Sequence, residues 1–115
     1  MKILKIDQKL REIIVKPENL NDLWTLYNII SEGDEVSTRT QRRVILKEGS
    51  TGERKVMNLK LKVESISFHE FSNRLRVKGK ILEGPDDFIS YGSYHTFNIE
   101  PLLKIRIIKE KWSNY

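Results

Sequence analysis

The sequence predicts a mostly-β (α+β) fold, a small, bent antiparallel β-barrel with one short helix. Apolar and polar residues alternate along three stretches with the period of two that is typical of strands. Only one stretch has helical spacing. With 115 residues, 38% of them hydrophobic and 32% charged, the chain has enough apolar material for one core. We therefore expect a single domain over residues 1–115.

The first third of the chain should contain two short strands and the helix. Ile3–Ile6 and Ile13–Lys16 are the expected strands. Apolar residues then recur at intervals of three and four, which indicates a helix of about three turns. These residues are Leu20, Leu23, Trp24, Tyr27, Ile29 and Ile30. Asn19 is the expected N-cap, Asp22 favours the positive N-terminal end, and Gly33 is placed to end the helix.

Two long strands should follow the helix. Val36–Leu46 is the first, and residues 47–53 form a loop with Gly, Ser and Thr that returns to Arg54. The second strand is indicated by alternating apolar residues at Met57, Leu59, Leu61 and Val63. Ile66 and Phe68 fall out of phase with these residues, which is what a β-bulge produces.

A hairpin should place a basic strand beside the bulged one. Ser72 and Asn73 are suited to the turn. Beyond the turn, apolar and basic residues alternate, with Leu75, Val77, Gly79 and Ile81 on one face and Arg74, Arg76, Lys78 and Lys80 on the other. Gly79 permits the sharp bend that closing a small barrel requires. A shorter alternation at Leu103, Ile105 and Ile107 predicts a last strand.

The net charge of +5 is concentrated in the middle of the chain. Between Arg39 and Lys80 there are twelve basic and four acidic residues. Clustered Lys and Arg bind phosphate backbones through counterion release, and Arg adds bidentate geometry. The predicted RNA-binding residues are Arg39, Arg42, Arg43, Lys47, Arg54, Lys55, Arg74, Arg76 and Lys78. The alternative is a solvated sheet face whose charges prevent edge-to-edge aggregation.

Four aromatic residues are candidates for stacking on unpaired bases: Tyr91, Tyr94, Phe68 and Phe71. For the two phenylalanines a place in the core is the favoured interpretation, because Phe is among the most buried residue types. The aromatic contribution to RNA binding therefore stays an open alternative.

Catalytic and metal-binding patterns are weak. The absence of Cys excludes disulfides, thiolate catalysis, iron-sulfur clusters and Cys-type zinc sites. Ser93 and His95 stand close together without an orienting acid or a nucleophile-elbow motif. His69-Glu70 and Asp86-Asp87 lack metal-ligand spacing, and the aspartates read first as a turn, although Mg²⁺ needs only one or two carboxylates. No apolar run approaches membrane-spanning length and no secretory signal is present, so a cytoplasmic protein is expected.

Three stretches together resemble the amino-terminal domain of the Pelota family, the archaeal and eukaryotic relatives of class I translation release factors. The first runs through Asp22–Ile30, Gly33–Val36 and Thr40–Val44. The second is Phe68–Arg76, followed by Gly79 and Glu83–Pro85. The third is Gly92–Glu100. The resemblance spans nearly the whole chain.

The resemblance implies an Sm-like barrel that enters the decoding site of the small subunit of a stalled ribosome, in mRNA surveillance, no-go decay and ribosome rescue. The segment from Arg39 to Arg54 would face the mRNA path, with mRNA and rRNA as partners. A translational GTPase, elongation factor one alpha in archaea, would bind mainly through other domains, and a recycling ATPase would split the subunits. We expect this chain to be an excised, monomeric domain without the central and carboxy-terminal domains, with no membrane partner.

The alternative function that the resemblance implies is a divalent-metal-dependent endoribonuclease, since some family members have been assigned this activity. A divalent metal cation would then be the cofactor, and the catalytic and metal-binding residues stay unassigned. The chain has no Gly-Gly-Gln tripeptide, so hydrolysis of peptidyl-tRNA is not expected.

Overall fold

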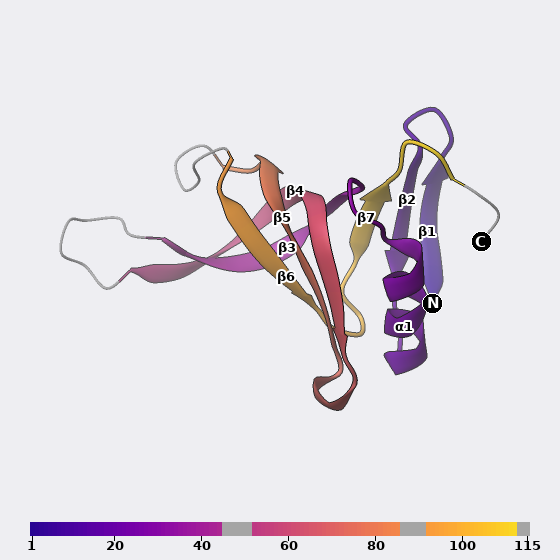
Figure 1. Ribbon diagram of the computed structural model, residues 1–115, viewed down its shortest axis with the longest axis horizontal. Coiled ribbons are helices and arrows are strands. Elements are labelled where there is room, and N and C mark those ends of the chain that lie inside the picture. Colours follow the sequence, from indigo (N-terminus) through magenta and orange to yellow (C-terminus); the bar gives the residue numbers. More distant parts are fainter. Residues whose placement is uncertain (45–51, 86–91, 113–115) are drawn as a thin grey trace.

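The computed structural model describes residues 1–44, 52–85 and 92–112, which form one antiparallel sheet of seven strands and one α-helix (Figure 1). The elements are β1 (Lys2–Asp7), β2 (Glu12–Lys16), α1 (Leu20–Ile29), β3 (Glu35–Val44), β4 (Glu53–His69), η1 (Glu70–Ser72), β5 (Arg74–Glu83), β6 (Tyr94–Ile99) and β7 (Ile105–Ile108). The order across the sheet is β1-β2-β7-β3-β4-β5-β6. The mostly-β fold with one short helix is therefore confirmed.

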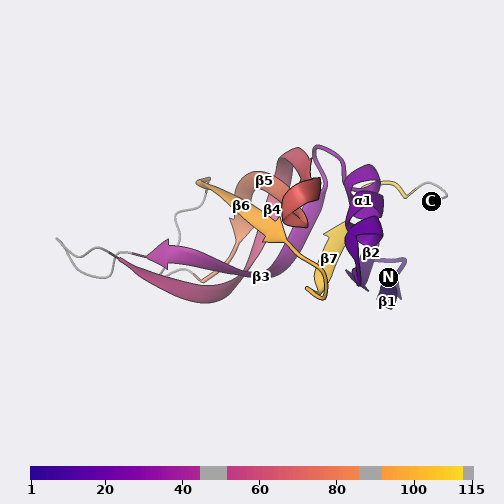
Figure 2. The same ribbon diagram turned by 90° about the horizontal axis from the view of Figure 1, so that it is seen from below.

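The sheet bends strongly but does not close, so the prediction of a closed barrel is wrong. Within the described residues, β1 and β6 each pair on one side only. The sheet stays open because β7 pairs with only the first four residues of β3, Glu35 to Thr38. From Arg39 onward, β3 pairs with β4 alone, and β3 and β4 project together beyond the rest of the sheet (Figures 1 and 2). An open seam is left between this part of β3 and β6.

The helix begins as its sequence predicts, but its buried side differs, because Leu26 was not among the expected apolar residues and the expected Trp24 is 52% exposed. Asn19 is the N-cap, and its side-chain oxygen accepts a hydrogen bond of 2.9 Å from the backbone N–H of Asp22. Leu23 and Leu26 are buried. The helix ends at Ile29, and Gly33 adopts a left-handed conformation (φ 92°) in the following turn. None of the helical segments described has the length and apolarity needed to cross a membrane.

The predicted bulge is present on β4 and explains Gly79. The β4–β5 register shifts between Val63 and Ser65, so Glu64 is the extra residue. Opposite the bulge, a Cβ atom built on Gly79 would lie 2.2 Å from the backbone oxygen of Lys62. Since no side chain fits at that distance, glycine is required for the two strands to approach as they bend.

Two parts of the sheet differ from the prediction. β6 was not predicted, because its apolar alternation is limited to Phe97 and Ile99 and its first residues are polar. The last strand begins at Ile105 rather than Leu103. Leu102 just before it has a positive φ of 77° and donates its N–H to the Pro17 oxygen at 2.6 Å, which makes a turn there. The strand predicted over Val36–Leu46 corresponds to β3, and its predicted last residue, Leu46, lies outside the described residues.

The core lies on the inner, concave face of the sheet and beneath α1. Its buried members are Val15, Leu23, Leu26, Ile30, Val36, Met57, Leu59, Leu61, Val63, Leu75, Val77, Ile81, Phe97, Ile99, Ile105 and Ile107. Each aliphatic side chain buried in this way contributes roughly 1.5–3 kcal/mol by leaving water. The core therefore holds β3, β4, β5 and β6 in the curved arrangement that frames the seam.

Candidate nucleic-acid interface

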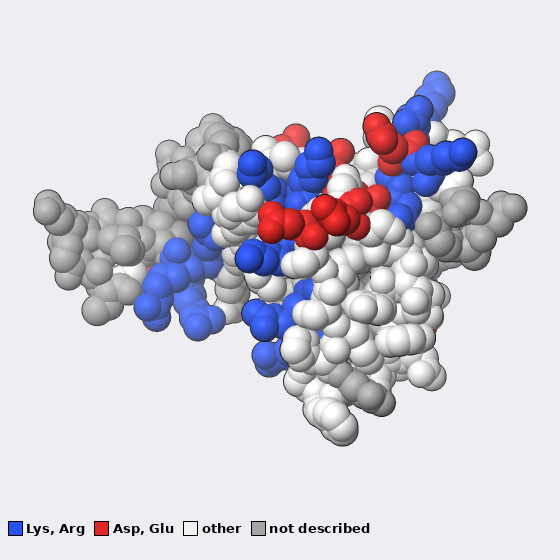
Figure 3. Space-filling view, viewed as in Figure 1, with Lys and Arg blue, Asp and Glu red and all other residues white. Residues whose placement is uncertain are grey.

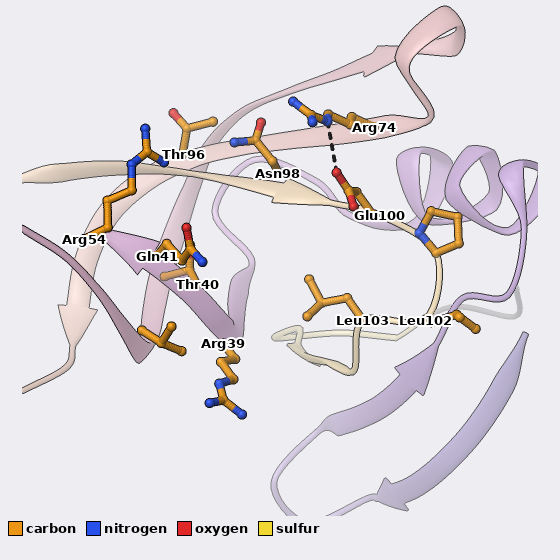
Figure 4. A pocket seen from close by; sticks show the side chains of 12 residues that line it. Arg39, Thr40, Gln41, Arg54, Arg74, Thr96, Asn98, Glu100, Leu102 and Leu103 are labelled. Carbon is orange, nitrogen blue, oxygen red and sulfur yellow. Dashed lines mark hydrogen bonds and ion pairs between the residues drawn. The ribbon is translucent and has the colours of Figure 1, made fainter. Parts of the chain in front are cut away.

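The open seam is lined by polar and basic side chains that form a groove of about 740 Å³ (Figure 4). We call it the seam groove. Its lining residues are Arg39, Thr40, Gln41, Arg54, Val56, Arg74, Thr96, Asn98, Glu100, Pro101, Leu102 and Leu103. Three arginines and one glutamate are among them, so the groove carries a positive charge. Such a surface attracts an extended anion more readily than a small apolar ligand.

The strand register separates the predicted arginines onto two faces. Residues paired across antiparallel strands point to the same side. Arg43 pairs with Arg54, and Arg39 pairs with Asn58, on the outer face. Arg42 pairs with Lys55 and lies on the inner face with the core residues. The predicted cluster of Arg39, Arg42 and Arg43 is therefore not one surface, and the groove receives Arg39 and Arg54 from the outer face.

Arg42 bridges the seam through His95. Its Nη1 donates to His95 Nδ1 at 3.2 Å and to the backbone oxygen of Tyr94 at 3.3 Å. Because a guanidinium can only donate, Nδ1 must be the unprotonated nitrogen. Nε2 then carries the proton and donates to Thr40 Oγ1 at 2.9 Å. Two side chains of β3 thus tie β6 in place where backbone hydrogen bonds do not.

Burial holds His95 in the neutral form that this bridge requires. Desolvation lowers the pKa of His95 to about 4, and the nearby positive charge of Arg42 acts in the same direction. The neutral imidazole accepts from Arg42, whereas an imidazolium would have no acceptor to offer. His95 and Arg42 therefore act as one structural unit at neutral pH.

The outer face of β5 and β6 continues the basic surface beyond the groove. Arg76 pairs with Asn98 and Lys78 pairs with Thr96, so both cations stand beside groove residues. Arg74 lines the groove, and its Nε donates to Glu100 Oε1 at 3.0 Å. Figure 3 shows basic side chains over the β3–β4 projection and over β5 and β6, with a band of acidic residues beside them in the middle of the view and a further basic group over the β1–β2 turn.

The predicted residues that the structure describes are thus spread over four places. Arg39, Arg54 and Arg74 line the groove, and Arg76 and Lys78 flank it. Arg43 lies on the outer face toward the end of β3, whereas Arg42 and Lys55 lie on the inner face. Lys47 lies outside the described residues. The sequence interpretation missed Gln41 of β3 and Thr96 and Asn98 of β6, and the signal of the last two depended on recognising β6 as a strand.

The aromatic candidates also divide. Phe68 packs against the core and the helix, as expected for a core residue, with its ring 5.5 Å from that of Trp24. Phe71 is fully exposed in η1, so the core interpretation is wrong for it. Tyr94 is half exposed, with Lys78 Nζ 5.7 Å from its ring centre. Tyr91 lies outside the described residues.

The described residues do not have the arrangement that the catalytic and metal-binding alternatives require. Both ring nitrogens of His95 are engaged by Thr40 and Arg42, so Ser93 and His95 do not form a nucleophile and base pair. Among the residues that the structure describes, no group of three or more His, Asp or Glu is placed to hold a metal ion. Asp86 and Asp87 and the side chain of Glu70 lie outside that part of the chain.

Comparison with known proteins agrees with this architecture. The family model of the Pelota N-terminal domain matches residues 1–115. The chain is 42% identical over 120 residues to the Protein pelota homolog of Methanobrevibacter smithii, covering 100% of this chain and 34% of the relative. It is 45% identical over 118 residues to that of Methanococcus aeolicus, covering 97% of this chain and 34% of the relative.

Solved structures give the same result. A model of ribosome-bound archaeal Pelota and ABCE1 superposes with a TM-score of 0.80 at 35% identity, over 98% of this chain and 33% of that one. The crystal structure of Archaeoglobus fulgidus Pelota has a TM-score of 0.70 at 37% identity, over 98% of this chain and 29% of that one. The chain thus spans about a third of the length of its relatives. It belongs to the Pelota N-terminal domain family.

Proposed function

We propose that this domain binds RNA along the seam groove and acts in ribosome rescue and mRNA surveillance, at the decoding site of stalled ribosomes. The observation that carries the proposal is the groove itself, an open strand edge lined by arginines and amides. Two relatives support the setting. One structure presents archaeal Pelota bound to the ribosome with ABCE1. Another presents yeast Dom34, 25% identical, as a translation termination-like factor involved in RNA quality control and interacting with Hbs1.

The groove suits a single RNA strand without reading its sequence. Arg39, Arg54 and Arg74 provide cationic donors for phosphates, and Asn98 and Gln41 add uncharged donors between them. None of these side chains is presented on a helix that fits a DNA major groove. Recognition would follow backbone charge and shape, as a factor that meets many different mRNAs requires.

The remaining partners follow from the same proposal. A translational GTPase and a recycling ATPase would be engaged mainly by domains of the longer relatives that this chain does not cover. Ribosomal RNA and mRNA would contact this domain, in the cytoplasm. The domain would enter as a monomer, with the arginines of its seam facing the RNA.

The test is a salt series of anisotropy titrations with single-stranded RNA. The double variant Arg39→Ala/Arg54→Ala removes two groove cations, so the slope of log K against log salt should become shallower by about 1.4, since each phosphate contact contributes about 0.7. The control, Lys2→Ala/Lys5→Ala, removes the same charge from exposed positions on β1, at the opposite edge of the sheet. An unchanged slope in the groove variant, or an equal change in the control, would refute the groove as the binding surface.

A further inference from the structure

Aromatic residues that are not part of the seam groove lie at the end of the β4–β5 hairpin and on α1 beside it. Phe71 has a relative exposure of 103%, and Trp24 of α1 is 52% exposed. Beside Phe71 is a pocket of about 430 Å³ lined by Phe68, His69, Phe71 and Ser72. A fully exposed aromatic ring that also lines a pocket differs from the scattered apolar residues found on any surface.

Three aromatic rings beside the hairpin end, those of Trp24, Tyr27 and Phe68, pack against one another. Trp24 stacks on Tyr27 at 5.4 Å and 18° and meets Phe68 edge-on at 5.5 Å and 70°. The turn beside them is ordered as well, because Ser72 Oγ donates to the His69 oxygen at 3.3 Å and Asn73 adopts a positive φ of 52°. The Phe68 wall of the pocket and the turn that carries Phe71 are therefore ordered before a partner binds, which lowers the entropic cost of binding.

The surroundings of the pocket favour a nucleic acid over an acidic or apolar protein surface. His69, which lines the pocket, pairs across the hairpin with Arg74, which lines the seam groove. The two sites are thus joined on one face of the hairpin. Where Figure 3 shows the surface over α1, it is largely uncharged, and basic side chains begin beside it. An aromatic site next to cations fits a base and its phosphate.

We propose that the pocket at Phe71 takes one unpaired nucleobase, which stacks on the Phe71 ring while the adjoining phosphate reaches Arg74. The inference rests on the proposed function, since it assumes that RNA lies in the seam groove. It adds a second contact of a different kind. Stacking on an aromatic ring tolerates every base, so the contact would strengthen binding to single strands without specifying a sequence.

The experiment compares RNA with an abasic oligomer of the same length and charge. Phe71→Ala should weaken binding to the normal RNA about tenfold, by the usual contribution of one stacked base, and leave the salt slope unchanged. Phe71→Trp should retain the affinity. Towards the abasic oligomer the wild type and Phe71→Ala should bind alike. Leu10→Ala is the matched control, because Leu10 is also exposed, at 60%, but lies between β1 and β2.

The outcomes separate this inference from the proposed function. If Phe71→Ala binds normal RNA as tightly as the wild type while Arg39→Ala/Arg54→Ala still flattens the salt slope, the stacking site is refuted and the groove stands. Such a result would point to a protein partner for Phe71. If the wild-type domain binds the abasic oligomer as tightly as RNA, stacking is also refuted. If the wild type binds neither, both proposals fall.

Discussion

Protonation of His95 should destabilise this domain in acid. The pKa of His95 is lowered from 6.5 to about 4 in the folded protein, mainly by burial. Between these two values the unfolded chain binds a proton that the folded one does not, so stability is fully present above pH 6.5 and is lost as the pH falls toward 4. The gap corresponds to about 3 kcal/mol, which solvent screening at a partly buried ring reduces to about 2 kcal/mol.

Urea unfolding at pH 7.5 and pH 4.5 measures this loss. Carboxylates also titrate in this range, so the comparison is made against His95→Gln, which keeps hydrogen-bonding capacity but cannot be protonated. The wild type should lose about 2 kcal/mol more than the variant over the same pH change. His69→Gln is the control, because His69 is exposed at the hairpin end. Equal losses in the wild type and His95→Gln would refute a neutral His95 as the acceptor for Arg42.

Two further predictions concern the close approach of β4 and β5 and the buried ion pair between Asp34 and Lys109. Gly79→Ala places a methyl group 2.2 Å from the Lys62 oxygen, which forces the strands apart at the bulge and should lower the free energy of unfolding in urea by about 2 kcal/mol. The control is the neighbouring Lys78→Ala, at an exposed position, which should lower it by under about 0.5 kcal/mol. Equal losses in the two variants would contradict the close approach of the strands. Asp34→Ala removes the carboxylate that accepts from the buried Lys109 at 2.5 Å and should cost about 3 kcal/mol. The double variant Asp34→Ala/Lys109→Met should recover part of that loss, and a further loss would show that the charge of Lys109 is stabilised elsewhere.

Much of the fold could be predicted because its signals are local. The alternation around Leu59 and Val77 predicted β4 and β5, and the phase change at Ile66 predicted the bulge opposite Gly79. Asn19 and Asp22 marked the start of the helix. β6 was missed because Tyr94, His95 and Thr96 put polar groups on both faces of the strand, so its first half has no apolar alternation.

The arrangement of the site was harder to predict because it depends on contacts between distant residues. A period of two already places Arg42 and Arg43 on opposite faces, but the sequence does not show which face is buried near the end of a projecting strand. The partner of Arg42 is His95, 53 positions later, and their contact exists only because the sheet curls back on itself. Phe71 was expected in the core because burial statistics describe a residue type, whereas its position at the end of a hairpin decides its exposure.

The central claim is that RNA lies in the seam groove, and an NMR titration of the isotopically labelled domain with single-stranded RNA tests it most directly. We expect the largest amide shifts at Arg39 and Gln41 on β3 and at Thr96 and Asn98 on β6, with no comparable shifts on β1 and β2. Shifts confined to β1 and β2, or RNA binding with no change along β3 and β6, would contradict it.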